Sequence, residues 1–368
     1  MGLTNRNVFI TTAAVLLFIL SFDVSATAQT LSPEKTKIIN PHGSSDFNSD
    51  GFQDLVIAAI GEEINDVTNA GAVTILYGNE SGTINLSSFV HQNTLGVPGD
   101  SQRGDQFGFA TISTDFNQDG YSDLIIGSPS KNADDIEDSG GVWIFFGGEG
   151  GIYSEIGSSK FIHQGLEMIP TIPEQSDHWG FTLETGDFDL DGFGDIVISA
   201  PGKTINGKEN SGEITILYGN RSRNLGQRVR TFNQSDRHIP DAAESDDRWG
   251  SALASGDFNG DGFSDLAIGS PGERWGDYTE VGAITILYGS KNGLKSEKSV
   301  RLHQSTPGVP DKNEPNDQWG SNLISGDFNN DGYEDIAIGT PNESSGDQKE
   351  TGTITILQGS SLGITTQK

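Results

Sequence analysis

Short apolar runs recur along this chain, and they lack the three-to-four-residue spacing of an amphipathic helix. One of them, Leu124-Ile125-Ile126-Gly127, is rich in β-branched residues and is followed by a Ser-Pro pair, as expected of a buried strand. Equivalent runs contain Ile57, Ile198, Ile268 and Ile338. This pattern predicts a chain built from short strands.

Three other features keep a fixed place relative to these runs. An aromatic-glycine pair precedes four of them, at residues 107–108, 179–180, 249–250 and 319–320. A glycine-bounded third strand follows all five, at residues 71–78, 140–147, 212–219, 282–289 and 352–359. A fourth strand ends at Gln92, Gln164, Gln234 and Gln304. Repeated units of four short antiparallel strands predict an all-β fold, a β-propeller, in which most strand edges are hidden.

A nine-residue pattern, Asp-x-Asn/Asp-x-Asp-Gly-x-x-Asp, directly precedes each apolar run. Its five copies, which we call the acidic loops, occupy residues 46–54, 115–123, 187–195, 257–265 and 327–335. Their starts are 69 to 72 residues apart, and so constant a period indicates one folded unit repeated five times.

The acidic loops have the chemistry of a calcium site. Side-chain oxygens at positions one, three and five can converge if the backbone turns sharply at the glycine of position six, which tolerates positive φ. Position seven would add a backbone carbonyl and position nine a carboxylate. Oxygen-only ligands in a flexible loop suit calcium better than magnesium. The predicted ligands, for up to five ions, are Asp46, Asn48, Asp50, Phe52 and Asp54; Asp115, Asn117, Asp119, Tyr121 and Asp123; Asp187, Asp189, Asp191, Phe193 and Asp195; Asp257, Asn259, Asp261, Phe263 and Asp265; and Asp327, Asn329, Asp331, Tyr333 and Asp335.

The EF-hand is the alternative for such a loop, because its loop begins in the same way. It ends in a bidentate Glu at position twelve and lies between two helices. Position twelve is isoleucine in all five copies here, within a predicted strand. The EF-hand is therefore rejected.

The first residues differ from the rest of the chain. Arg6, a mostly apolar segment from Val8 to Leu20 and the small-residue pattern at 26–28 predict a signal peptide over residues 1–28. The mature chain, residues 29–368, is then the propeller and is expected to be secreted, periplasmic or on the cell surface, with no membrane insertion after cleavage. The alternative, an uncleaved anchor, has an apolar stretch shorter than the roughly 20 residues of a spanning helix.

Net charge restricts the classes of partner that the chain can bind, and cysteine content restricts how its fold is stabilised. A net charge of -30 over 368 residues argues against nucleic acid and anionic membranes. Without cysteine there is no disulfide framework, so an exported chain must be held by core packing and metal.

The aromatic-glycine pair and the acidic loop together resemble a known family. Phe-Gly followed by Asp-Phe-Asn-x-Asp-Gly-Tyr-x-Asp-Leu-Ile-Ile-Gly-Ser-Pro is similar to the FG-GAP repeat of integrin α propellers and of many exported bacterial proteins, over nearly all of residues 46–359. The resemblance implies acidic loops between the first and second strands of each blade, on one face. The opposite face would carry the loops after Pro129, Pro201, Pro271 and Pro341. In integrins that face contacts ligand and partner subunit, so a protein or glycan ligand is expected there.

Closure of the ring is the main departure from the integrin pattern, which has seven blades where this chain has five loops. Lys37-Ile38-Ile39 could complete either the first or the last blade. We expect a five-bladed ring closed by this segment. The alternative is an incomplete, seven-bladed-type ring finished by another chain, with self-association.

None of the six histidines lies in a recognisable catalytic motif. His91, His163 and His303 share one repeat position and are interpreted as strand residues, and the chain has no serine-nucleophile, zinc-protease or phosphate-loop motif. The sequence therefore favours a non-catalytic adhesion or interaction module. The alternative is a propeller hydrolase, or the accessory subunit of an exported hydrolase.

Other repeated residues are given structural roles. Asp105, Asp177, Asp247 and Asp317 are expected to accept hydrogen bonds in turns, and Trp143, Trp179, Trp249 and Trp319 to lie in the core. Trp275 is different, because it lies with Arg274 and Tyr278 in a loop on the expected ligand face, where such residues are enriched at binding hot spots.

Overall fold

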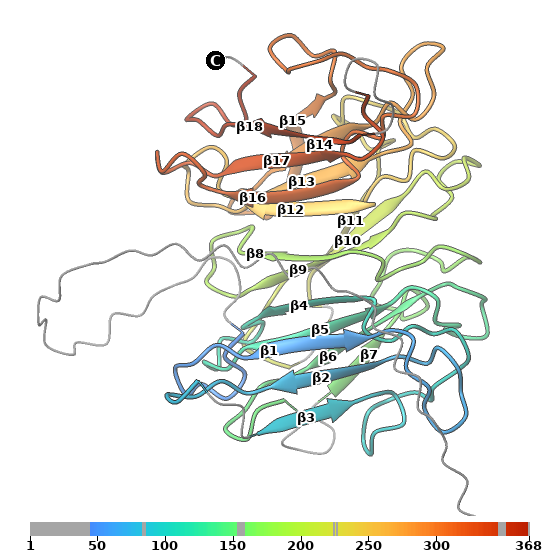
Figure 1. Ribbon diagram of the computed structural model, residues 1–368, viewed down its shortest axis with the longest axis vertical. Helices are drawn as coiled ribbons and strands as arrows, with labels where there is room; N and C mark the ends of the chain where they lie inside the picture. The colour runs from blue at the N-terminus through green and yellow to red at the C-terminus, as the bar shows by residue number, and fades with distance from the viewer. Residues whose placement is uncertain are drawn as a thin grey trace, which may run out of the picture. The chain divides into compact units, whose positions relative to one another are not determined.

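The computed structural model describes residues 45–82, 86–152, 159–223, 225, 227–344 and 351–366. By its internal contacts the chain divides into residues 1–39 and 40–368, and all described residues belong to the second unit. Five antiparallel sheets form the described residues, which contain no helix (Figure 1). The all-β expectation is confirmed, while the predicted signal peptide lies outside the described residues. The described residues therefore include no candidate for a membrane-spanning helix.

Each sheet corresponds to one sequence repeat, and we number them as the first to fifth blades. The first blade contains β1 (Leu55–Ala59), β2 (Ala72–Leu76) and β3 (Ser87–Val90). The second contains β4 (Ala110–Thr114), β5 (Asp123–Ser128), β6 (Gly141–Phe145) and β7 (Ser159–Ile162). The third contains β8 (Leu183–Gly186), β9 (Asp195–Ala200), β10 (Glu213–Leu217) and β11 (Val229–Phe232). The fourth contains β12 (Ala252–Gly256), β13 (Asp265–Ser270), β14 (Ala283–Tyr288) and β15 (Lys295–Leu302). The fifth contains β16 (Asn322–Gly326), β17 (Asp335–Thr340) and β18 (Thr353–Leu357).

The acidic loops and the proline-following loops lie at opposite ends of the strands. In the second blade, the acidic loop joins the end of β4 to the start of β5, and residues 129–140 connect β5 to β6. Because neighbouring strands are antiparallel, these two connections fall at opposite ends of β5. This is the arrangement that the FG-GAP resemblance implies.

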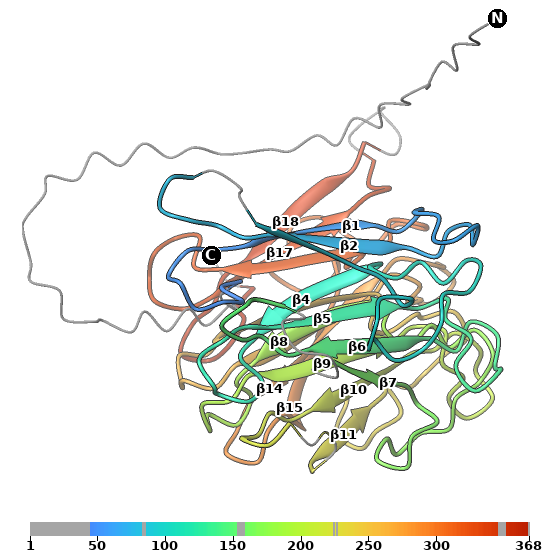
Figure 2. The ribbon, with the colours of Figure 1, turned by 90° about the horizontal axis from the view of Figure 1, so that it is seen from below.

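Neighbouring blades pack through their inner strands and through the aromatic-glycine pairs. Strand β4 contacts β8, β8 contacts β12 and β12 contacts β16, and Figure 2 shows the second and third blades next to each other. Trp249 is fully buried and its backbone nitrogen donates to Ser211 O of the preceding blade at 3.0 Å. Each of four apolar clusters draws its residues from two successive blades. The core therefore lies between the blades.

The described residues do not close a ring. Figure 1 shows the first and fifth blades at opposite ends of the series. Second strands β5, β9 and β13 are buried throughout, whereas Ile57 in β1 is 46% exposed, and Ile354 in β18 is 75% exposed. These residues thus do not form the closed five-bladed ring expected from the sequence. They form an open array of five blades, as in the alternative of an incomplete ring. The proposed closing segment, Lys37 to Ile39, lies outside the described residues.

Candidate metal centres

Hydrogen bonds within each acidic loop fold its side-chain oxygens around the glycine of position six. In the second blade, Asp115 Oδ1 accepts from the Asp119 nitrogen at 3.1 Å, and its Oδ2 accepts from the Gly120 nitrogen at 3.0 Å. Asn117 Oδ1 accepts from the same Asp119 nitrogen at 2.9 Å. Gly120 has φ 91°, which confirms the sharp turn expected at position six, and the equivalent glycines have φ between 89° and 91°. Positions one, three and five therefore project from one tight turn.

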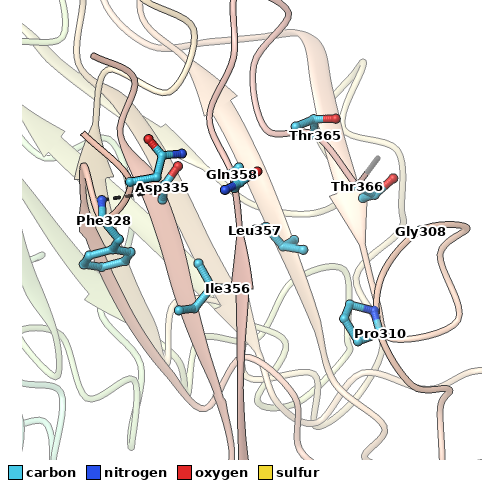
Figure 3. Close-up of a pocket in the computed structure, with 10 residues that line it drawn as sticks. Gly308, Pro310, Phe328, Asp335, Ile356, Leu357, Gln358, Thr365 and Thr366 are labelled. Carbon is cyan, nitrogen blue, oxygen red and sulfur yellow. Dashed lines mark hydrogen bonds between the residues drawn. The ribbon is translucent and has the colours of Figure 1, made fainter. Parts of the chain in front are cut away.

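The aspartate at position nine attaches the loop to the next hairpin. Asp123 is fully buried, and its two carboxylate oxygens accept from the backbone nitrogens of Phe116 at 3.1 Å and Gly147 at 2.9 Å. Both bonds recur in all five blades at 2.9 to 3.2 Å. Figure 3 shows the first of them in the last blade, from the nitrogen of Phe328 to Asp335. The residue thus joins the start of the loop, its end and the third strand.

Burial makes these position-nine carboxylates costly to ionise. Burial, with the nearby carboxylates of Asp119 and Asp115, raises the pKa of Asp123 to about 8 against the two backbone hydrogen bonds. The pKa of Asp265 is raised to about 8 by the same causes, with burial the largest. A divalent cation beside such a group would favour its charged form, so the electrostatics of the loops suit a cation.

The donor set fits a calcium ion. Among the described residues, the third acidic loop is the only one of the five in which three carboxylates, those of Asp187, Asp189 and Asp195, each offer an oxygen within 4.8 Å of the others. Oxygen-only donors at this spacing are the ligands that calcium takes. Arg228, just before β11, pairs with Asp189, so one positive charge already lies beside this loop. Ligation by the carbonyl of position seven stays a prediction.

The repeated aspartates and tryptophans have the structural roles expected of them. Asp105, Asp177, Asp247 and Asp317 each accept a backbone hydrogen bond from the residue three before them, at 2.6 to 2.8 Å. The four repeated tryptophans are fully buried. Trp275 is 44% exposed and Tyr278 is 48% exposed, and they pair across a turn on the face opposite the acidic loops.

One repeated position was missed in the sequence. Two residues after each proline, or after Ile60 in the first blade, stands a charged residue: Glu62, Lys131, Lys203, Glu273 and Glu343. In the structure its carbonyl accepts from the glycine that opens the third strand, at 2.9 to 3.3 Å. Its fixed offset from the proline is a signal that could have found it.

Comparisons with known proteins agree with this architecture. The model of the FG-GAP repeat matches residues 43–76, 107–145, 179–217, 249–287 and 319–357. Each matched segment contains one acidic loop and the strands beside it.

Curated relatives are similar to part of the chain. Phosphatidylinositol-glycan-specific phospholipase D of Mus musculus is 32% identical over 163 residues, which is 44% of this chain and 18% of that protein. Integrin alpha-PS3 of Drosophila melanogaster is 30% identical over 168 residues, 45% of this chain and 14% of that protein. The chain therefore aligns with less than a fifth of the length of either relative.

Among solved structures, a rhamnogalacturonan lyase of Bacillus licheniformis is similar over 77% of this chain and 52% of its own, at 13% identity and a TM-score of 0.37. That score is too low to indicate a shared fold. The FG-GAP matches, in contrast, cover more than half of the chain and coincide with its five blades. The chain belongs to the FG-GAP repeat family.

Proposed function

We propose that this protein is an exported, calcium-binding β-propeller that acts as a non-catalytic adhesion or interaction module. The observation that carries the proposal is the acidic loop, folded in the same way in five blades and joined by position nine to the next hairpin. When bound, calcium would supply positive charge and coordination to up to five such loops. Binding to the folded state alone stabilises that state.

The ligand, a protein or a glycan, would bind on the face opposite the acidic loops. There Trp275 packs against His303 with ring centroids 4.0 Å apart and the rings tilted by 39°, and the guanidinium of Arg301 lies 5.7 Å from the Trp275 ring. A half-exposed tryptophan supported in this way is ordered before a ligand arrives, which lowers the entropic cost of binding. The other blades have smaller residues at this turn, so the fourth blade is the expected centre of contact.

A location outside the cytoplasm agrees with these features. The chain has no cysteine and a strongly acidic balance, and its proposed metal is abundant outside cells. We infer a secreted, periplasmic or cell-surface protein that does not bind nucleic acid.

A calcium-dependent binding assay tests the interaction role. The chain from residue 29 is applied to protein and glycan arrays in calcium, and hits are measured again with Trp275→Ala and Tyr278→Ala. We expect at least a tenfold loss of affinity in either variant. Leu86→Ala is the matched control, because Leu86 is 56% exposed just before β3, outside the acidic loops and at the other end of the strands. Equal loss in all three variants would contradict the proposed ligand face.

The second candidate function is a hydrolase or the accessory subunit of one. It is favoured by the names of the relatives, since phospholipase D is an enzyme, although the shared region is 18% of that protein. Calcium-dependent turnover of phosphodiester, ester or glycoside substrates would support this candidate. Absence of turnover in that screen would count against the hydrolase and favour the interaction module.

A further inference from the structure

Each interior blade has two apolar faces, one toward each neighbouring blade. In the second blade, Leu124 and Ile126 of β5 belong to the apolar cluster shared with the first blade. Ile125 and Ile144 belong to the cluster shared with the third blade. Successive residues of a strand point to opposite faces of its sheet, so we call the first of these the leading face and the second the trailing face. All four junctions divide in the same way and pack a trailing face onto the leading face of the next blade.

The first blade exposes its leading face. Leu55 and Ile57 of β1 stand at the repeat positions of Leu124 and Ile126. They are 55% and 46% exposed, whereas Leu124 and Ile126 are at most 1% exposed. The side chains are the same at both places, so the difference lies in the neighbouring blade. The first blade covers β5, and the described residues leave this face of β1 open.

The fifth blade exposes its trailing face. Ile354 and Ile356 of β18 stand at the repeat positions of two fully buried isoleucines of β14. In β18 they are 75% and 54% exposed. Ile356 pairs with Ala337 of β17, and Ala337 pairs with Ile324 of β16, which is 62% exposed. An apolar row therefore crosses all three strands of this sheet on the side where the interior blades hold a neighbour.

A glycine beside the third strand gives the fifth blade the form of an interior junction. A Cβ placed on Gly140 would lie 2.1 Å from the carbonyl oxygen of Trp179 in the next blade, and the equivalent glycines of the first, third and fourth blades meet the next aromatic residue at 2.1 to 2.3 Å. Gly352 holds this place in the fifth blade, with φ +70°. The nearest atom to a Cβ there is the carbonyl oxygen of Pro341, 3.2 Å away in the same blade. The fifth blade thus has room for the close approach of a following blade.

We propose that the trailing face of the fifth blade packs on the leading face of the first blade of a second copy of this chain. The contact continues the four junctions within the chain, none of which pairs two like faces. Neither β1 nor β18 contains a charged residue, so no charge in these strands opposes it. End repeats of stacked arrays need polar outer faces for solubility, whereas these two ends are apolar and are the two halves of one interface.

Contact between unlike faces produces head-to-tail assembly. Each molecule offers one half of the interface at each end, so the assembly is a closed ring or an open chain of copies rather than a symmetric dimer. The first blade has no aromatic-glycine pair, so the contact lacks that part of an interior junction and is expected to be reversible. It uses the sides of the end blades and not their loops, so it does not depend on the proposed ligand face.

Sedimentation velocity of residues 29–368 in calcium tests the contact with two single variants and their mixture. Ile57→Lys places an ammonium on the leading face of the first blade, and Ile354→Lys places one on the trailing face of the fifth. Each variant alone should stay monomeric, because it keeps only one half of the interface. An equimolar mixture should form a dimer of one variant with the other that grows no further. Leu95→Lys is the matched control, since Leu95 is as exposed as Ile354 but lies outside the strands, and it should associate like the wild type.

The mixture separates this contact from the other ways of covering the two ends. Both substitutions are at exposed positions, and thermal melting checks that each variant is folded before mixing. Association of either folded variant alone would overturn the proposal, because it would mean that two like faces pair. A mixture of folded variants that stays monomeric would overturn it too. A wild type that is monomeric at every concentration would also overturn it, by indicating that the ends are covered within one chain.

Discussion

The aspartates of one acidic loop have two distinct tasks. Asp119, at position five, is exposed and organises the turn, while Asp123, at position nine, is fully buried and joins two hairpins. Only the common ligand role could be predicted from the sequence. The role of Asp123 in joining two hairpins requires Gly147 to lie close to it, and the register of the sheet sets that distance.

Substitution separates these two tasks. Asp123→Asn keeps the shape but leaves an amide group facing a backbone N–H, so it should destabilise the fold by about 2 kcal/mol or more, with or without calcium. Asp119→Asn should lower the melting temperature only when calcium is present. Urea denaturation in calcium and in EGTA measures both. If Asp123→Asn were harmless in EGTA, position nine would be a ligand and nothing more.

Glu213 on β10 provides a test by pH that does not involve the acidic loops. Burial raises its pKa from 4.5 to about 7, against the opposing effect of Lys203. The folded state therefore holds a proton that the unfolded state releases between these values, and stability falls as pH rises through that window. The loss should reach about 3 kcal/mol, since one pKa unit corresponds to ~1.4 kcal/mol.

The Glu213→Gln variant should remove this part of the pH dependence. Denaturation at constant, saturating calcium from pH 4.5 to 8 is compared with the wild type. The wild-type curve should fall more steeply than that of the variant. Parallel curves would show that Glu213 does not hold a proton in the folded protein.

At the scale of elements, the junction between blades relies on a glycine. Gly212 has φ +95°, and a Cβ placed there would lie 2.1 Å from the Trp249 carbonyl oxygen. The aromatic-glycine pair of one blade thus packs against the glycine just before the third strand in the preceding blade. The repeats were evident in the sequence, but this contact was not, because it joins residues 37 positions apart across two sheets.

Alanine at this junction should lower the free energy of unfolding much more than alanine at a nearby turn. Gly207 also has positive φ, +78°, but a Cβ there meets nothing within 4 Å. Gly207→Ala should cost about 1 kcal/mol, from backbone strain alone. Gly212→Ala adds a backbone clash and should cost roughly 3 kcal/mol or more. Equal unfolding free energies for the two variants would contradict the packing account.

Strand positions could be predicted from the sequence because the apolar runs are short, regular and bounded by glycine. Ile126, Ile198 and Ile268 all lie in buried second strands, as expected. The repeated charged position that includes Glu343 was missed because its side-chain contact with Gln304 joins residues 39 positions apart, which meet only when two blades pack.

At the scale of the molecule, the described array ends in two apolar faces. Ile324 and Ile356 are 62% and 54% exposed in the fifth blade, and Leu55 is 55% exposed in the first. Ring closure could not be predicted from the pattern of apolar residues, because the apolar runs of the first and fifth blades have the same composition as the buried runs of the inner blades. Exposed apolar surface of this kind is typical of an interface.

We expect the end faces to drive self-association of the chain from residue 29. Sedimentation velocity should show a larger species as concentration rises, and Ile354→Lys should abolish it. Leu362→Lys is the matched control, since Leu362 is 93% exposed outside the strands. A monomer at every concentration would contradict an array completed by a second copy.

The central claim is that calcium in the acidic loops holds the blades together. Native mass spectrometry and thermal melting of the chain from residue 29 test it most directly. The account predicts close to five calcium ions and a melting temperature that falls by many degrees in excess EGTA. A chain that takes up no calcium and melts at the same temperature in calcium and in EGTA would contradict it.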